Sequence, residues 1–161
     1  MSGEPTATPA GSRVLRGLLT AMAVALVAAL AYQAVGAAIF GPRLGSDDPA
    51  EVVMAYFDAQ RWGYRGIAES VLSDDEREMR DAPNYVRPII PDELFAQDLV
   101  VEGPSDIALR GENDEEVQFR VGYRSLWRNE IGEPPGRRHW FVYLGRDAGE
   151  SWQVLGQGTG P

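Results

Sequence analysis

The most pronounced pattern in the chain is an uncharged apolar stretch of 24 residues near the N-terminus, Gly17–Phe40. A helix of that length is roughly 36 Å long, enough to cross a hydrocarbon layer of roughly 30 Å. A cleavable signal peptide, with Ala29–Ala31 as the cleavage site, is the alternative. Length favours a transmembrane helix at 17–40, preceded by a disordered tail at 1–16 and followed by a linker at 41–47. Residues 48–161 then form the one folded domain.

Helical spacing continues after the linker. Asp48 is suited to cap a helix that begins with Pro49, and the apolar positions predict that this helix runs over 49–62. A shorter second helix is expected to end near Ser73. Ser73 then opens a capping box before the charged run Glu76–Asp81. Because arginines alternate with the acids in this run, we expect an exposed helix and no metal site.

Three prolines interrupt residues 82–92, which predicts a loop with extended pieces. Ile89, Ile90, Leu94 and Phe95 are apolar enough to cover one end of the core. This segment is the most lid-like part of the chain.

From Asp98 onward the hydrophobic period changes from 3.6 to 2. Three to five antiparallel strands are expected, from the candidates 99–101, 107–109, 117–127, 138–144 and 151–155. In the longest run, the odd-numbered residues from Val117 to Trp127 share one face, which we expect to be buried. The last residues, 156–161, are expected to fray. The order of elements predicts an α+β domain in which a long helix packs across one face of a curved antiparallel sheet.

This layout resembles the nuclear transport factor 2-like, or cystatin-like, superfamily. The resemblance rests on the helical segment Pro49–Ala59, on the pair Val71-Leu72, and on Trp140–Leu144 followed by a glycine-containing turn and Ser151–Leu155. It covers residues 48–156 and extends to exported domains of Gram-positive bacteria in domain-of-unknown-function families of this fold. It implies a conical pocket between the sheet and the first helix. Members include isomerases and dehydratases, binding or dimerisation modules, and membrane-tethered scaffold subunits.

Charge narrows the range of partners. The formal net charge is −9, and residues 44–161 carry 12 Arg against 23 Asp and Glu. Such an acidic domain repels phosphate backbones and anionic lipid surfaces, so we expect no nucleic-acid binding. All 15 basic residues are arginine, which is typical of a GC-rich, actinobacterial genome. The chain has no cysteine, which excludes disulfides and thiolate chemistry.

Two groups of residues are candidates for function. Aromatic residues that could line a ligand pocket are Tyr56, Trp62, Tyr123, Trp127 and Trp140, although aromatics at strand spacing are more often core residues. Arg120, Arg124 and Arg128 share one face of the long strand, where they either balance neighbouring acids or mark a docking face for an anionic partner or a second copy.

No catalytic set is recognisable in the sequence. His139 is the single histidine, and Asp58, its possible partner, is expected to point outward from its helix. We therefore expect no catalytic residue, no metal and no cofactor.

The sequence predicts a single-pass membrane protein whose domain, outside the cytoplasm, binds a protein or a ligand. The alternatives are an isomerase- or dehydratase-type pocket enzyme and a scaffold subunit of an envelope secretion or conjugation assembly. Arg13 and Arg16 before the span, against Arg43 after it, place the N-terminus inside the cell.

Overall fold

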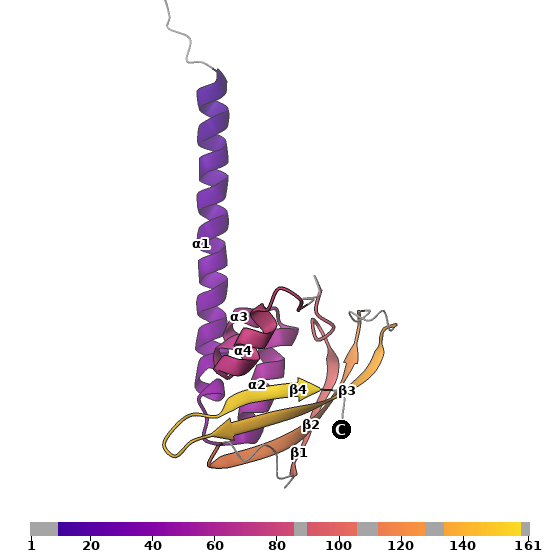
Figure 1. Cartoon of the computed structure of the whole chain (residues 1–161). Coiled ribbons are helices and arrows are strands. Elements are labelled where there is room, and N and C mark those ends of the chain that lie inside the picture. Colours follow the sequence, from indigo (N-terminus) through magenta and orange to yellow (C-terminus); the bar gives the residue numbers. More distant parts are fainter. Residues whose placement is uncertain (1–9, 86–89, 106–112, 128–133, 159–161) are drawn as a thin grey trace, which may run out of the picture. The chain divides into compact units, whose positions relative to one another are not determined.

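The computed structural model describes residues 10–85, 90–105, 113–127 and 134–158. It is an α+β structure with one long apolar helix, three short α-helices and a four-stranded antiparallel open sheet in these residues (Figure 1). The chain divides into two compact units, Met1–Val35 and Gly36–Pro161.

Helix α1 (Ala10–Leu44) contains the apolar stretch. From Val14 onward it is long and apolar enough to cross a membrane, although a signal sequence near an N-terminus has the same properties. Its side chains between Val14 and Val35 are exposed. The structure therefore confirms one apolar helix that is consistent with a single membrane span.

The end of α1 differs from the sequence-based expectation. The sequence predicts a span that ends at residue 40 and a linker from 41, but the helix continues through Gly41 and Pro42 to Leu44. Pro42 lacks a backbone N–H, so one helical hydrogen bond is missing in the last turns. Phe40 and Leu44 are only 5% and 3% exposed and belong to the core of the second unit. Burial of these two side chains, worth roughly 1.5–3 kcal/mol each, offsets the lost hydrogen bond.

Replacing Gly36 by valine is expected to destabilise the second unit by about 1–3 kcal/mol, the usual cost of overpacking. A Cβ atom at Gly36 would collide with the ring of Tyr64 and the side chain of Ile67. Gly41→Val is the matched control, because a Cβ atom there meets nothing within 4 Å in the same helix. Thermal unfolding of the full chain in detergent measures the difference, and equal unfolding midpoints for the two variants would contradict it.

Helix α2 (Pro49–Arg61) confirms the predicted first helix of the domain. The Asp48 carboxylate accepts a hydrogen bond from the N–H of Ala50 at 2.9 Å, and Pro49 occupies the first helical turn. Tyr56 and Phe57 are 0% and 2% exposed and lie at the centre of the core. The sheet thus packs against the apolar face of α2.

The short second helix is split into α3 (Arg65–Ala68) and the 3₁₀ helix η1 (Glu69–Val71). Helix α4 (Asp74–Asp81) follows. Its predicted cap is confirmed, because the Ser73 hydroxyl accepts a hydrogen bond from the N–H of Glu76 at 3.3 Å.

The expectation that this charged helix is exposed is wrong for one of its sides. Glu76 and Arg80 are each only 5% exposed. They form an ion pair at 2.7 Å between Arg80 Nε and Glu76 Oε1. An i, i+4 spacing places both side chains on the same face of the helix, where each supplies the partner that the other needs inside a protein.

The sheet is a meander in the order β1-β2-β3-β4, with every pair antiparallel, as the alternating pattern predicts. The strands are β1 (Gln97–Ser105), β2 (Glu115–Ser125), β3 (Gly136–Arg146) and β4 (Gln153–Gly158). The long hairpin of β2 and β3 pairs continuously from Glu115↔Arg146 to Ser125↔Gly136. It is the most regular part of the sheet.

Two strand ends extend further than expected. Strand β1 continues through Gly103 and Pro104 to Ser105. Strand β4 continues to Gly158, because Gly156 and Gly158 pair with Tyr143 and Phe141 of β3. The candidate strand at 107–109 lies outside the described residues.

The core fills the space between α2 and one face of the sheet (Figure 1). The predicted buried face of the 117–127 run is confirmed at its centre, with Phe119 and Val121 at 0% and Tyr123 at 3% exposed, whereas Val117 and Trp127 at its two ends are half-buried. Trp152 and Val154 lie in the same core. We call this the inner face of the sheet, and the opposite face the outer face.

Candidate functional site

The five aromatic candidates do not gather around one cavity. Tyr56 and Tyr123 are buried in the core, whereas Trp62 is 51% exposed at the end of α2. Trp140 lies beside Tyr123 and donates a hydrogen bond from its indole N–H to the Tyr123 hydroxyl at 2.8 Å. The indole N–H of Trp127 donates to the carbonyl of Leu94 at 2.7 Å. The structure thus brings Tyr123 and Trp140 together and leaves Trp62 apart.

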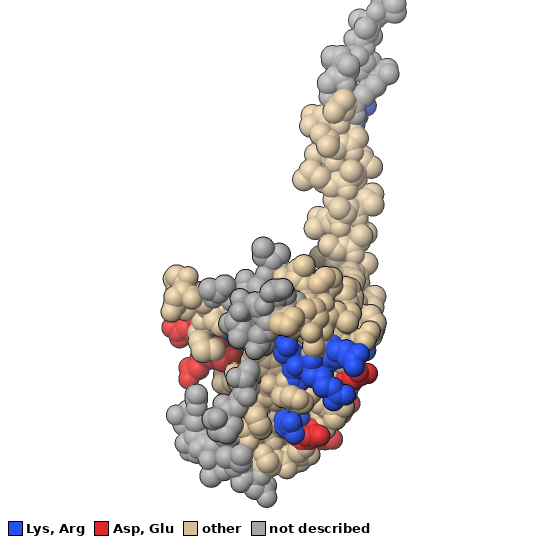
Figure 2. Space-filling model, turned by 90° about the vertical axis from the view of Figure 1, so that its right-hand side faces the viewer, with Lys and Arg blue, Asp and Glu red and all other residues tan. Residues whose placement is uncertain are grey.

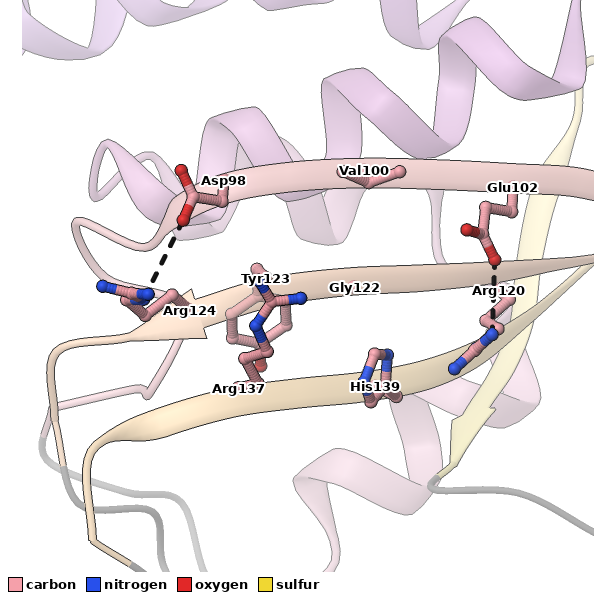
Figure 3. Close-up of a pocket in the computed structure, with 9 residues that line it drawn as sticks. All are labelled: Asp98, Val100, Glu102, Arg120, Gly122, Tyr123, Arg124, Arg137 and His139. Carbon is pink, nitrogen blue, oxygen red and sulfur yellow. Dashed lines mark hydrogen bonds and ion pairs between the residues drawn. The ribbon is translucent and has the colours of Figure 1, made fainter.

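The outer face of the sheet carries a hollow of about 130 Å³. Its lining comes from three strands (Figure 3): Asp98, Val100, Glu102, Arg120, Gly122, Tyr123, Arg124, Arg137 and His139. We call this the arginine hollow. It contains Arg120 and Arg124 of the predicted interaction face, while Arg128 lies outside the described residues.

Strand alternation and register together build the arginine hollow. Arg120, Gly122 and Arg124 are two residues apart on β2 and so point to the same face. Gly122 pairs with His139, and Arg124 pairs with Arg137. Because Gly122 has no side chain, the imidazole of His139 lies over the strand, and a Cβ atom there would be 3.3 Å from His139 Nδ1.

Two of the three arginines have acidic neighbours on β1. Arg120 Nη1 lies 3.4 Å from Glu102 Oε2, and Arg124 Nε lies 3.8 Å from Asp98 Oδ2. The side chains of these acids are 62% and 69% exposed, so both pairs are screened by water. Arg137 makes no ion pair with a residue that the structure describes.

Arg137 and His139 were not predicted as part of this face. The alternating pattern of 138–144 already placed His139 opposite Trp140, but the cross-strand pairing with β2 was needed to place it beside Gly122. Figure 2 shows arginine side chains gathered on one face of the molecule, with acidic side chains beside them. Planar guanidinium groups bind carboxylates and phosphates through paired hydrogen bonds, so a cationic hollow on an acidic domain is suited to an anionic group.

A second polar cluster lies on the inner side, where the segment before β1 meets the sheet. Asp92 and Glu93 are each 7% exposed. Asp92 accepts hydrogen bonds from the Tyr123 hydroxyl at 3.2 Å and from Arg138 Nε at 3.3 Å. The Ser125 hydroxyl donates to the backbone carbonyl of Asp92 at 2.7 Å. These bonds join the segment to β2 and β3.

This arrangement reverses the expectation for the segment that we called lid-like. Its apolar residues were expected to cover the core, but Ile90 and Phe95 are 44% and 50% exposed while the two acids are buried. Leu94 is half-buried, and Ile89 lies outside the described residues. The reason is that Tyr123, Ser125 and Arg138 present hydrogen-bond donors at this end of the sheet, which apolar side chains would leave without partners.

Burial shifts the ionisation of this inner cluster. Burial, with the neighbouring Asp92 carboxylate second, raises the pKa of Glu93 to about 7. Burial also raises the pKa of the Tyr123 hydroxyl, with the charges of Glu93 and Asp92 acting in the same direction. Arg65 acts in the opposite sense on Glu93 but does not cancel the effect.

The ion pair of α4 belongs to a third polar group in the core. Arg80 Nη2 donates to the Tyr56 hydroxyl at 3.2 Å, and that hydroxyl donates to Gln157 Oε1 on β4 at 3.2 Å. Burial raises the pKa of Tyr56 to about 12. These hydrogen bonds connect α4, α2 and β4, so the group has a structural role.

Two expected absences can be compared only with the described part of the chain. There, no group of three or more His, Asp or Glu side chains is arranged to hold a metal ion. His139 and Asp58 do not form a pair: His139 lies in the arginine hollow, and Asp58 accepts a hydrogen bond from Arg43 Nη1 at 3.2 Å.

Comparisons of this chain with models of protein families, with curated proteins and with solved structures find no match.

Proposed function

We propose that the chain is a single-pass membrane protein whose C-terminal domain, held outside the cytoplasm, binds a carboxylate-rich segment of a protein partner in the arginine hollow. The observation that carries the proposal is this hollow itself, in which three arginines meet on the outer face of a strongly acidic domain. The apolar helix α1 supports the membrane anchor, and the arginines at 13 and 16 support the orientation.

The ion pairs in the arginine hollow are weak enough for the carboxylates of a ligand to replace Glu102 and Asp98 as partners of the arginines. Exposed ion pairs such as Arg120–Glu102 and Arg124–Asp98 are worth roughly 0–1 kcal/mol, so an incoming carboxylate displaces them at small cost. Arg137 adds a charge that has no partner among the described residues. Protein carboxylates in a flexible segment can approach three strands at once, which suits a hollow formed by three strands.

The nuclear transport factor 2-like fold remains part of the proposal. Helices on one face of an antiparallel meander agree with that layout. The superfamily contains binding modules as well as enzymes, so the fold does not choose between them. The open outer face, together with an inner face filled by core side chains, favours a binding module.

The single histidine provides a direct test in the full chain. In detergent micelles, the imidazole signal of His139 is expected to shift in a saturable way when a short peptide of aspartate and glutamate is added, because the imidazole lines the arginine hollow. The variant Arg124→Glu, a single charge reversal in the hollow, is expected to weaken this binding at least tenfold. High salt is expected to weaken it too.

The matched control is Arg77→Glu, a charge reversal of equal sign at an arginine of α4 whose side chain is 45% exposed. It is expected to leave the peptide titration unchanged. A titration that is equally weak in the wild type and in both variants would show that the arginine hollow does not bind acidic peptides. Equal weakening by both reversals would show an effect of net charge alone.

A pocket enzyme that uses general acid–base chemistry is the second candidate. Glu93 favours it, because its carboxyl group is buried and has a pKa of about 7. Neither Glu93 nor Asp92 lines the arginine hollow, nor do they line a second, open groove between Trp62 and Phe95 at the end of α2. The hydrogen bonds of Asp92 connect the segment before β1 to the sheet, which is a structural role. For this reason we place catalysis second. A saturable, slow turnover that Glu93→Gln abolishes without unfolding the chain would reverse this order.

A further inference from the structure

The imidazole of His139 differs in its chemistry from the other charged groups that line the arginine hollow. Arginine keeps its positive charge at every physiological pH, and aspartate and glutamate ordinarily lose their protons near about pH 4. Histidine ordinarily changes charge between about pH 5 and 8. His139 is the single histidine of the chain. The charge of the hollow therefore varies with pH through this side chain.

The sheet places the imidazole among the arginines. His139 pairs with Gly122 across the β2–β3 hairpin, and Arg137 precedes it by two residues on the same face of β3. Figure 3 shows the imidazole between the side chains of Arg120 and Arg137. Gly122 leaves room for the ring, since a Cβ atom there would be 3.3 Å from His139 Nδ1. An anion that reaches these guanidinium groups therefore also reaches the imidazole.

The charged side chains around the imidazole come from three strands. They are Arg120 and Arg124 on β2, Arg137 on β3 itself, and Asp98 and Glu102 on β1. Strand β4 carries no charged side chain in its residues 153–158. Tyr123 also lines the hollow, but its hydroxyl is bonded to Asp92 and Trp140 on the inner side. A proton on His139 thus changes the lining from three positive and two negative side chains to four and two.

The imidazole is available to a ligand. It is exposed, and it makes no hydrogen bond or ion pair with another residue that the structure describes. In a neutral imidazole one nitrogen donates a hydrogen bond and the other accepts one, whereas in a protonated imidazole both nitrogens donate. A carboxylate only accepts hydrogen bonds, so it binds better to the protonated ring.

We propose that His139 makes the binding of the carboxylate-rich segment depend on pH, with the protonated imidazole acting as a fourth cation that contacts a carboxylate of the ligand. This inference rests on the proposed function, because it concerns the ligand of the same hollow. Loss of the proton leaves three arginines and weakens the binding. By linkage, a bound carboxylate promotes the uptake of a proton by the ring.

The proposed location gives this dependence a role. A domain held outside the cytoplasm is exposed to the pH of its surroundings, which the cell does not buffer. The segment of the partner is then held more tightly when the surroundings are acidic and less tightly when they are alkaline. The arginines bind the segment at both extremes, so His139 adjusts the affinity and does not create it.

Calorimetric titration of the full chain in an uncharged detergent, with a short peptide of aspartate and glutamate as the probe, tests the inference. The wild type is expected to bind the peptide roughly three- to tenfold more tightly at about pH 5.5 than at about pH 8. The carboxylates of the peptide are charged at both values. Titrations near neutral pH in two buffers with different enthalpies of ionisation are expected to show that binding takes up a fraction of a proton.

Two substitutions at position 139 fix the charge that the wild type changes. His139→Gln is expected to bind at both pH values with the lower affinity of the wild type, because the amide carries no charge. His139→Arg is expected to bind at both with the higher affinity, because the guanidinium group keeps its charge. Neither variant is expected to take up a proton on binding. A merely structural role of His139 would not give these opposite results.

Glu93→Gln is the matched control for the proton. Burial raises the pKa of Glu93 to about 7, so this carboxyl group titrates in the same range of pH, but it does not line the hollow. The control variant is expected to keep the pH dependence of the wild type. A pH dependence that persists in His139→Gln would overturn the inference, and its loss in Glu93→Gln would identify the inner cluster as the source of the proton.

The same titrations separate this inference from the proposed function. If the wild type binds the peptide equally well at both pH values, the arginine hollow still binds acidic segments and His139 does not regulate it. If the wild type binds the peptide at neither pH, the proposed function and this inference both fail.

Discussion

Replacing Arg80 by methionine is expected to lower the free energy of unfolding by about 3–5 kcal/mol, the usual cost of breaking a buried ion pair from one side. Arg80 and Glu76 are each 5% exposed. Methionine fills a similar volume but leaves the Glu76 carboxylate without its 2.7 Å partner and the Tyr56 hydroxyl without its donor. Urea unfolding of the full chain in a mild detergent, followed by tryptophan fluorescence, measures the loss.

Two further variants separate the loss of a partner from the loss of packing. Glu76→Gln/Arg80→Met removes both charges and is expected to recover most of the lost stability, because no unpaired charge remains buried. Arg77→Met, on the exposed side of the same helix, is expected to cost less than about 1 kcal/mol. If Arg80→Met were as stable as Arg77→Met, the buried pair would not contribute as we infer.

The elements that the sequence predicts well depend on interactions between near neighbours. Asp48 and Ser73 begin helices because their side chains accept hydrogen bonds from N–H groups two and three residues ahead. The change of hydrophobic period near Asp98 marks the passage from helices to strands. Such features are visible in a short window of sequence, so α2, α4 and the β2–β3 hairpin were expected close to their observed bounds.

The differences arise where distant residues supply the partners. The helix α1 passes Pro42 because Phe40 and Leu44 find a core made by other elements. Glu76 is hidden because Tyr56 and Gln157 complete a polar group with Arg80, and Gln157 is on the last strand. A hydrophobic pattern treats every charged residue as exposed, so no local window indicates such burial.

The arginine hollow illustrates both cases at once. Alternation along β2 places Arg120 and Arg124 on one face, as the sequence predicts. The neighbours of that face depend on register: Gly122 opposes His139, and Arg124 opposes Arg137. Register follows from the connection between β2 and β3 and from the burial of the opposite face. The hollow therefore emerges only when two strands are aligned.

The aspartate and glutamate before β1 are a further example. Asp92 and Glu93 look like a solvent-exposed pair in a proline-rich loop, since charged residues are rarely buried without partners. The partners of Asp92 are Tyr123 and Arg138, which belong to β2 and β3, and Glu93 is hydrogen-bonded to Asp92 in turn. Pairs separated by such distances in the sequence can be joined only by the fold.

The stability of the folded unit is expected to fall as pH rises from about 4.5 to about 7, through the single carboxyl group of Glu93. Its pKa is raised from 4.5 to about 7 in the fold, chiefly by burial. Below pH 4.5 the group is protonated in both the folded and the unfolded chain. Between the two values only the folded chain keeps the proton, so each unit of pH costs about 1.4 kcal/mol, or about 3 kcal/mol in all.

Glu93→Gln isolates this contribution, because the amide has the shape of the protonated carboxyl group and does not titrate. The variant is expected to gain stability relative to the wild type as pH rises through this window, and to reach a constant difference above pH 7. The neighbouring Asp92 carboxylate opposes a charge on Glu93 and Arg65 favours it, so these two groups modulate the size of the gain that burial sets.

Glu78→Gln, at an exposed position of α4, is the matched control and is expected to show no such trend. Unfolding midpoints of the three proteins in the same detergent, measured from pH 4.5 to 8, provide the comparison. A difference between Glu93→Gln and the wild type that stays constant over this range would mean that Glu93 is charged in the folded protein. The segment before β1 would then be held by the Asp92–Arg138 pair and its neighbours alone, and the Glu93 carboxyl group would not be protonated in the fold.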